Sequence, residues 1–359
     1  MTDRQRVYRK VLKTLKEQLR MFHQGHVVTL AMMITGIVMS GKAQLSKMST
    51  EIPTAAQDQS IEMRMRRWVK HPRIDVELTY MPFAQQILQS LSGSPLLLAM
   101  DGSQVGRGCM VLMVGVVYHS RLLPLAWVVY PGKKGHTTAE RHLAVLGKVL
   151  PLLPADAEVV LLGDAEYDTT DMLAWVQAET SWDFVLRTSR NLLVQDQGTW
   201  QPIGAFDVTH GRLKLIPDIA FTQSAALPAH LVVWWGVAYK EPIFLVTSLP
   251  NASRAAYAYR RRFRIETFFS DQKSRGFHIH KSHLADPARV SRLLIAACLA
   301  YVWMIGLGLL TLANGKHKLI DRTDRIDKSI FRLGRDWFTY ILKKGLPIPV
   351  LFRFVPVLC

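Results

Sequence analysis

Residues 96–188 alternate between short apolar segments and helix-like segments, and this alternation constrains the fold more than any other feature of the 359-residue chain. Three apolar segments come first, each short enough for a strand: 96–100, 109–119 and 122–130. A helix-like and a strand-like segment then follow twice in succession: 138–149, 158–164, 169–179 and 182–187. Antiparallel strands followed by β–α alternation predict a mixed α/β sheet with helices on both faces.

The rest of the chain is organised around this segment. Apolar residues recur at helical spacing near the N-terminus, and short strand-like pieces separated by turn residues follow residue 188. Later helices are predicted from about Ser253, over 288–313 and over 324–344. We therefore expect a helical region at 1–92, a core at 93–188, a β-rich insertion at 189–250, the second part of the core at 251–315 and a helical C-terminal region at 316–359.

The charge balance points to a polyanionic partner. Lys and Arg total 45 while Asp and Glu total 28, which leaves a formal net charge of +17 and a pI near 9.9. Such an excess is unusual for a generic metabolic enzyme and favours nucleic acid or an anionic membrane surface as the partner. Hydrophobic residues at 49% and charged residues at 20% exclude a disordered or collagenous chain.

The membrane alternative depends on one uncharged segment, residues 293–315. Its length would allow a transmembrane helix, but a helix buried in a large α/β core is apolar on every side as well. Basic residues flank both ends, so the positive-inside rule gives no orientation. We expect a core helix and no membrane partner.

Cysteine usage and the N-terminus favour the cytoplasm. The three cysteines, Cys109, Cys298 and Cys359, have neither the spacing of metal ligands nor that of a disulfide framework. Residues 1–20 are polar and lack the apolar core of a signal peptide.

Two segments of the N-terminal region have features of DNA-binding proteins. A helix predicted over 26–40 ends at Gly41 and precedes a second short helical segment, as in a helix-turn-helix. Residues 62–74 then carry five basic residues and one acid. A solvated helical face would explain the same charges, so this segment alone does not establish DNA binding.

Asp101 and Asp164 each follow an apolar strand, in the sequences AMDGSQ and LLGDAEYD. Ligands gather at the carboxyl ends of strands in α/β sheets, and carboxylate oxygens suit a hard cation such as Mg²⁺. An Asp also ends a strand simply because it starts a turn, so either residue alone would be ambiguous. Asp164 is preferred over Glu166 and Asp168 because it directly ends the apolar run.

The helix predicted from Ser253 carries four different functional groups on one face. Tyr259, Arg262, Glu266 and Lys273 stand at offsets of 0, 3, 7 and 14 residues. At about 100° per residue, these positions fall within an arc of roughly 60°. A carboxylate flanked by a guanidinium and an ammonium suits a metal ligand between phosphate-binding groups.

Three further arginines, Arg260, Arg261 and Arg264, lie off this arc and are placed to reach a phosphate backbone. The alternative is an amphipathic surface helix in which Arg262 and Glu266 form an ordinary i,i+4 ion pair. Such an exposed pair contributes little stability, and packing gives no reason for four such groups to share one arc. Two strand-end aspartates and a helical glutamate in a basic chain therefore predict two-metal phosphoryl transfer.

This arrangement resembles the DDE transposases of bacterial insertion sequences, in the subgroup marked by the pattern Y-(2)-R-(3)-E-(6)-K. Tyr259, Arg262, Glu266 and Lys273 match the pattern at every position and spacing. The resemblance covers roughly residues 96–300 and implies an RNase H-like mixed-sheet catalytic core, with a β-strand insertion domain before the Glu-bearing helix. It also implies that the N-terminal helical region binds DNA.

Carried over to this sequence, the resemblance implies roles for the matching residues. Asp101, Asp164 and Glu266 would form the catalytic, metal-binding triad, with Mg²⁺ as the cofactor and Mn²⁺ as an accepted substitute. Arg262 and Lys273 would hold phosphates near the cleavage site.

The resemblance also implies an aromatic contact to DNA. Tyr259 would contact the backbone beside an extruded base, because related enzymes cut by a hairpin route that needs a base flipped from the stack. Trp234 or Trp235, in the insertion, would receive that base. Neighbouring strand residues point to opposite faces, so core packing is the alternative for at least one of them.

The sequence therefore predicts a cut-and-paste transposase that binds terminal inverted repeats and joins the released ends to target DNA. A homodimer on double-stranded DNA, in a nucleoid-associated cytoplasmic location, is expected with it. Three alternatives stay open: a metal-dependent nuclease or resolvase with the same core but no strand transfer, a DNA-binding protein with an inactive core, and a basic membrane-surface protein.

Overall fold

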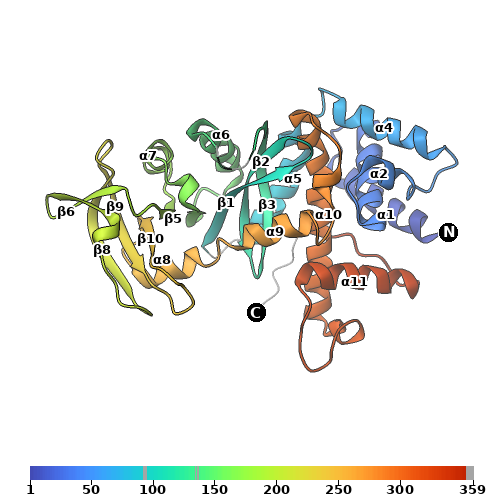
Figure 1. Cartoon of the computed structure of the whole chain (residues 1–359). Coiled ribbons are helices and arrows are strands. Elements are labelled where there is room, and N and C mark those ends of the chain that lie inside the picture. The colour runs from blue at the N-terminus through green and yellow to red at the C-terminus, as the bar shows by residue number, and fades with distance from the viewer. Residues whose placement is uncertain (92–94, 134, 136, 353–359) are drawn as a thin grey trace.

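The computed structural model describes residues 1–91, 95–133, 135 and 137–352, which form an elongated α/β molecule (Figure 1). The inserted strands lie at one end and the N-terminal helices at the other. Between the sheet and the N-terminal helices stands the long helix α10 (Pro287–Ala313). The boundary expected between residues 92 and 93, like Cys359, lies outside the described residues.

The described strands form one ten-stranded mixed sheet in the order β3-β2-β1-β4-β5-β10-β9-β8-β6-β7. In chain order they are β1 (Leu96–Val105), β2 (Cys109–Tyr118), β3 (Arg121–Pro131), β4 (Val159–Gly163), β5 (Asp183–Thr188), β6 (Leu193–Asp196), β7 (Thr199–Pro202), β8 (Leu213–Phe221), β9 (Leu227–Trp234) and β10 (Ile243–Thr247). Strand β4 runs parallel to both β1 and β5, while the other described pairs are antiparallel. The fold class is thus the predicted RNase H-like mixed sheet with an inserted β-rich segment.

The insertion continues the core sheet. Strand β10 pairs antiparallel with β5, and β9, β8, β6 and β7 extend the sheet outward from β10. Because β5 precedes the insertion and β10 ends it, the chain leaves and re-enters the core at neighbouring strands. This return places the next helix, α8 (Ala252–Tyr259), beside β4 and β5.

Helices occupy both terminal regions and cover the sheet, as predicted. The others are α1 (Asp3–Gln18), α2 (Gln24–Ser40), α3 (Leu45–Ser49), α4 (Asp58–Lys70), α5 (Val76–Gln89), α6 (Ala139–Val149), α7 (Thr170–Glu179), α9 (Arg264–Gln272) and α11 (Ile330–Lys343). Gly41 ends α2 in the left-handed conformation, with φ of 67°, where glycine has no Cβ to clash. The chain then turns into the five-residue helix α3.

Helix α10 contains the segment that raised the membrane alternative. It is long and apolar enough to cross a membrane by length and composition alone, with a mean hydropathy of 2.4 over its most apolar window. In the structure, 94% of that window is buried inside the chain, against α2, α4, α5, β3 and α11. Trp303 at its centre is fully buried and donates its indole N–H to Pro349 O at 2.8 Å. This burial is that of the expected core helix.

Two sequence-based expectations for the elements are wrong. Strand β1 does not end at Asp101, because its antiparallel ladder with β2 continues through the pair Val105–Cys109. Only its parallel pairing with β4 ends before Asp101, at the pair Ala99–Leu162. The C-terminal helix begins at Ile330 rather than 324, where the Ser329 side chain accepts from the Arg332 N–H.

The long basic helix expected from Ser253 is also interrupted, and α8 and α9 are separate helices. Between them the N–H groups of Arg261, Arg262 and Arg264 donate to carbonyls three residues earlier. Such bonds wind the backbone at about 120° per residue instead of 100°. The 60° arc, which assumed one continuous α-helix from Tyr259 to Lys273, is therefore wrong.

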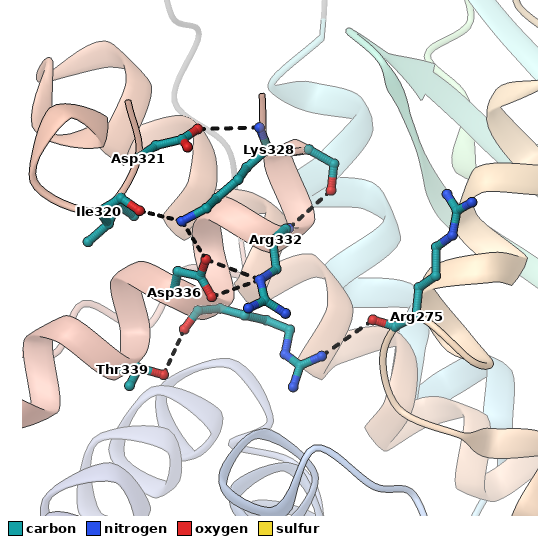
Figure 2. Close-up of polar contacts among 9 residues, drawn as sticks. Arg275, Ile320, Asp321, Lys328, Arg332, Asp336 and Thr339 are labelled. Carbon is teal, nitrogen blue, oxygen red and sulfur yellow. Dashed lines mark hydrogen bonds and ion pairs between the residues drawn. The ribbon is translucent and has the colours of Figure 1, made fainter. Parts of the chain in front are cut away.

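Ion pairs and hydrogen bonds connect residues 320–328 to helix α11, which follows them (Figure 2). Asp336 accepts from Arg332 at 2.9 Å and from Lys328 Nζ at 3.0 Å. Lys328 also donates its ammonium to Ile320 O and its backbone N–H to Asp321. These contacts tie the segment that precedes α11 to the helix itself.

Helices α10 and α11 pack so closely that glycines are required at their contact. A Cβ atom added at Gly334 would lie 1.8 Å from Met304 O, and one added at Gly308 would lie 2.0 Å from Ile330 O. Both clashes are with backbone, so the helices themselves would have to move apart.

Gly334→Ala is expected to destabilise the chain by about 1–3 kcal/mol, the usual cost of overpacking a core. Urea unfolding of the purified chain measures this change. Gly147→Ala on α6 is the matched control, because a Cβ there meets nothing within 4 Å. Removing a helical glycine should raise stability by up to about 1 kcal/mol at that site. Equal shifts in the two variants would contradict the close contact.

Candidate active site

The sheet brings Asp101 and Asp164 to the same end of neighbouring strands. The parallel ladder of β1 and β4 ends at the pair Ala99–Leu162, and each Asp lies two residues beyond it. Asp164 caps a short 3-10 turn, where its Oδ1 accepts from the Ala165 N–H at 3.0 Å. Its side chain is 37% exposed, so this carboxylate is open to a ligand.

Tyr167 holds the Asp101 carboxylate, and sequence reasoning did not single it out. The fully buried phenol donates to Asp101 Oδ1 at 3.3 Å, and the Gly102 N–H donates to the same oxygen at 2.8 Å. Burial, then the charge of Asp101, raises the pKa of Tyr167 well above its ordinary value, so the phenol stays a proton donor. Its position three residues after Asp164 was the available signal.

Arg262 connects Asp164 to Glu266. Its buried guanidinium donates from Nη2 to Glu266 Oε1 at 2.9 Å, and the same nitrogen lies 3.8 Å from Asp164 Oδ2. Arg187 on β5, which sequence reasoning missed, lies 3.8 Å from the other oxygen of Asp164. The Asp164 carboxylate therefore stands between two cations, and Arg262 brings Glu266 into the same group.

Lys273 lies on the β1 side of this group. Its ammonium donates to Ser103 Oγ at 2.6 Å, two residues beyond Asp101 on the same strand. Lys273 itself follows α9, with a backbone conformation outside the helical region. Helix α9 packs against β1 and β3, which carries Glu266 and Lys273 to the end of the sheet where the aspartates lie.

No three His, Cys, Asp or Glu side chains within the described ranges lie close enough together to hold a metal ion. The donor types still suit Mg²⁺ or Mn²⁺, because Asp101, Asp164 and Glu266 offer only carboxylate oxygens. The Arg262 guanidinium occupies the position between two of these carboxylates. The three carboxylates therefore have the right chemistry for a divalent cation. In this structure the Arg262 guanidinium supplies the positive charge that neutralises two of them.

A cleft of about 630 Å³ opens beside this group, between the β9–β10 loop and the α8–α9 segment. Most of its lining side chains are basic or aromatic: Arg187, Tyr239, Lys240, Tyr259, Arg260, Arg262, Phe263 and Arg264. The acid Glu241 and the apolar residues Ala238, Pro242 and Ile243 complete the lining. Phe263 is 53% exposed, which is unusual for a large apolar ring. Cations interleaved with the exposed rings of Tyr239 and Phe263 are suited to a nucleic-acid strand, whose phosphates and bases they contact, while Tyr259 is largely buried at the cleft wall.

Neither Trp234 nor Trp235 lines the cleft. The Trp234 ring meets the ring of Tyr239 edge-on, with centroids 5.0 Å apart. The Trp235 indole N–H donates to Tyr239 O at 3.0 Å. Both tryptophans thus support Tyr239, and Tyr239 is the aromatic side chain of the insertion that reaches the cleft wall.

The three arginines predicted to lie off the helical face have different environments. Arg260 is exposed at the cleft, and Arg264 also lines it. Burial and the nearby Arg121 and Arg261 lower the pKa of Arg264. Arg261 instead packs over the Tyr257 ring, 3.4 Å from its centroid, and donates to Tyr257 O.

A family profile described as "Transposase DDE domain" matches residues 93–303, which is more than half of the chain and includes Asp101, Asp164 and Glu266. No curated protein matches the chain. Eight chains of solved structures match, one of them from a "Cryo-EM structure of piggyBac transposase synaptic complex with hairpin DNA". That chain is 11% identical, with a TM-score of 0.45 and coverage of 96% of this chain and 80% of that one.

Proposed function

Because the chain belongs to the transposase DDE domain family, we propose that it is a cut-and-paste transposase of the Y-(2)-R-(3)-E-(6)-K subgroup. It would bind the terminal inverted repeats of its element, cleave there and join the ends to target DNA. The observation that supports this best is the parallel register that aligns Asp101 with Asp164, together with the Arg262 contacts that connect Asp164 to Glu266.

In this proposal Asp101, Asp164 and Glu266 hold divalent cations, Mg²⁺ or Mn²⁺. A bound cation would supply Lewis-acid stabilisation of the oxygens that attack and leave the phosphorus. Tyr167 orients the Asp101 carboxylate through its hydrogen bond. A guanidinium and a divalent cation repel each other, so Arg262 would move away from Glu266 in a loaded site and would then be available to a DNA phosphate.

The remaining assignments concern DNA. Lys273 and Arg260 would contact phosphates, as would Arg261 and Arg264, while Tyr259 would lie against the backbone at the cleft wall. A base extruded along a hairpin route would enter the cleft and meet the aromatic group of Trp234, Trp235 and Tyr239. A homodimer that pairs two DNA ends in the bacterial cytoplasm, at the nucleoid, completes the proposal.

We also propose that the five sequence segments act as functional units. The helical region at 1–92 would bind the terminal repeat, residues 93–188 and 251–315 would form the catalytic core, and the insertion at 189–250 would contact the extruded base. Residues 316–359 would serve contacts between protomers.

The test uses a labelled duplex that carries the inverted repeat flanking the coding sequence. With Mg²⁺ and an unlabelled target duplex, we expect cleavage at the repeat end and then joined products of higher mass. Cleavage without joined products would favour the metal-dependent nuclease or resolvase. Binding without cleavage, in either Mg²⁺ or Mn²⁺, would favour the DNA-binding protein with an inactive core.

A further inference from the structure

A cluster of basic side chains surrounds the loop after α9, where the N-terminal and C-terminal helices meet the core. We name it the basic junction, and its members are Lys42, Arg275, His278, His280, Lys281 and Arg335. Lys273 of the candidate site adjoins the junction, because its carbonyl accepts from the His278 N–H at 2.9 Å and its charge acts on His280. The basic junction is therefore adjacent to the candidate active site at Lys273.

Backbone contacts hold the three segments of the junction together. On the N-terminal side, the Ala43 N–H donates to Phe277 O at 2.7 Å, and the Gln44 amide donates to Lys281 O at 2.7 Å. On the C-terminal side, the Arg335 guanidinium donates to Arg275 O at 3.4 Å. The loop that leads into α3, the loop after α9 and helix α11 are thus fixed around one surface.

Positive charge at the junction has little compensation from nearby acid. Asp271 interacts with Arg275 and Arg335, but it is buried and already paired with Arg121 at 3.1 Å. Asp336 also interacts with Arg335, but it is paired with Lys328 and Arg332. Arg275, Lys42 and Lys281 are exposed. Figure 2 shows the Arg275 side chain extending away from the ion pairs of the C-terminal region. The surface is suited to an anionic ligand that spans several cations.

Two neighbouring imidazoles lie among these cations, with ring centroids 6.0 Å apart. The positive charges of Lys281 on the same loop, Lys42 before α3 and Arg335 on α11 all act on His278. His278, Lys281 and Lys273 interact electrostatically with His280, whose buried Nδ1 has no hydrogen-bond partner in the part of the chain that the structure describes. Burial and these cations lower the pKa of both histidines, which favours the neutral ring at both positions in the free protein.

We propose that the basic junction binds backbone phosphates of duplex DNA, and that His278 and His280 take up protons as the phosphates enter. The inference rests on the proposed function, because a transposase needs DNA to extend from the N-terminal helical region to the active site. The junction contacts both, through Ala43 and Gln44 on one side and Lys273 on the other. It therefore offers a continuous path for one stretch of DNA backbone.

The proton uptake follows from charge. A phosphate placed among Lys42, Lys281 and Arg335 offsets the repulsion that keeps the imidazoles neutral. An imidazolium also makes a stronger, charge-assisted hydrogen bond to a phosphate oxygen than a neutral ring does. Because the bound state then holds more protons than the free state, affinity for DNA must rise as pH falls, on the order of tenfold per pH unit for each proton taken up.

The test measures binding of the full chain to a labelled duplex of arbitrary sequence by fluorescence anisotropy, at pH 6.0, 7.0 and 8.0 and constant ionic strength. We expect affinity to rise several-fold per pH unit toward pH 6.0. The double substitution His278→Gln and His280→Gln should remove most of this dependence. His119→Gln, an exposed histidine in the β2–β3 turn with no assigned DNA contact, is the matched control and should retain it.

Calorimetry in two buffers of different ionisation enthalpy counts the protons directly, with one to two expected for the wild-type chain. Lys42→Ala and Lys281→Ala alter exposed side chains, so they should fold normally and reduce the salt dependence of binding by about one counterion each. DNA binding without proton uptake, or a double variant with unchanged pH dependence, overturns the inference and leaves the proposed function standing. A chain that binds no duplex at any pH overturns the proposed function itself.

Discussion

Asp101→Asn is expected to reduce metal-dependent DNA cleavage by a factor on the order of a thousand or more, while DNA binding changes little. The substitution keeps the size of the side chain and its contact with Tyr167, but removes the charge that would hold a divalent cation. Loss of several kcal/mol of transition-state stabilisation accounts for a factor of this size. Cleavage of the labelled repeat duplex measures the first quantity, and anisotropy with the same duplex measures the second.

Asp171→Asn provides the matched control for this prediction. Asp171 is exposed in the first turn of α7, close in sequence to Asp164 but with no assigned part in the site. It should cleave at the wild-type rate. Wild-type cleavage by Asp101→Asn, with circular dichroism unchanged, would remove Asp101 from the triad.

The order of strands and helices in the core could be predicted because its signals are local. The apolar segment 158–164 is bounded by turn residues, and the structure has a strand there, Val159–Gly163. The parallel register that aligns Asp101 with Asp164 depends on residues about sixty positions apart, so the local pattern placed each aspartate after an apolar segment but did not give their alignment.

The geometry of the basic segment could not be predicted in the same way. Helical spacing from Tyr259 to Lys273 assumes one regular helix, but the backbone tightens where it passes the cleft. The spacing did indicate the contact between Arg262 and Glu266, four residues apart on adjoining turns. It could not indicate that the same guanidinium would lie 3.8 Å from Asp164, because that contact depends on how α8 and α9 dock beside β4.

Aromatic residues at the cleft show the same limit. Trp234 and Trp235 stood out by size and position in the insertion, whereas Tyr239 lies in the loop after them. Which ring faces the cleft depends on the path of the β9–β10 loop, and neighbouring residue types do not determine that path. Tyr167 was missed for a related reason, since its hydrogen bond to Asp101 joins the turn after β4 to strand β1.

The second large effect concerns the buried ion pair that joins α9 to the β2–β3 turn. Arg121 Nε lies 3.1 Å from Asp271 Oδ2, and the two side chains are 10% and 5% exposed. Burial raises the pKa of Asp271 to about 6, from an ordinary value of 3.8, although Arg121, Arg275 and Arg335 oppose this rise. The cost of burying the carboxylate therefore exceeds the attraction of its partners.

The sign of the pH effect follows from this difference. Between about pH 4 and pH 6 the folded chain keeps the Asp271 proton while the unfolded chain has lost it. Because the folded state then binds more protons, stability falls as pH rises through this window and the loss is complete above it. A shift of this size corresponds to about 3 kcal/mol.

Asp271→Asn should abolish this loss, because the amide does not ionise. The free energy of unfolding of the wild-type chain, measured relative to that of the variant, should therefore decrease by about 2 kcal/mol from pH 4 to pH 7, because part of the loss has already occurred at pH 4. Urea unfolding at several pH values gives both curves, and Asp156→Asn, an exposed aspartate, is the comparison for losing one carboxylate. If the two curves instead stay parallel, the Arg121 pair fully compensates the burial of Asp271, and the ionised pair fastens α9, with Glu266 and Lys273, to the sheet at every pH.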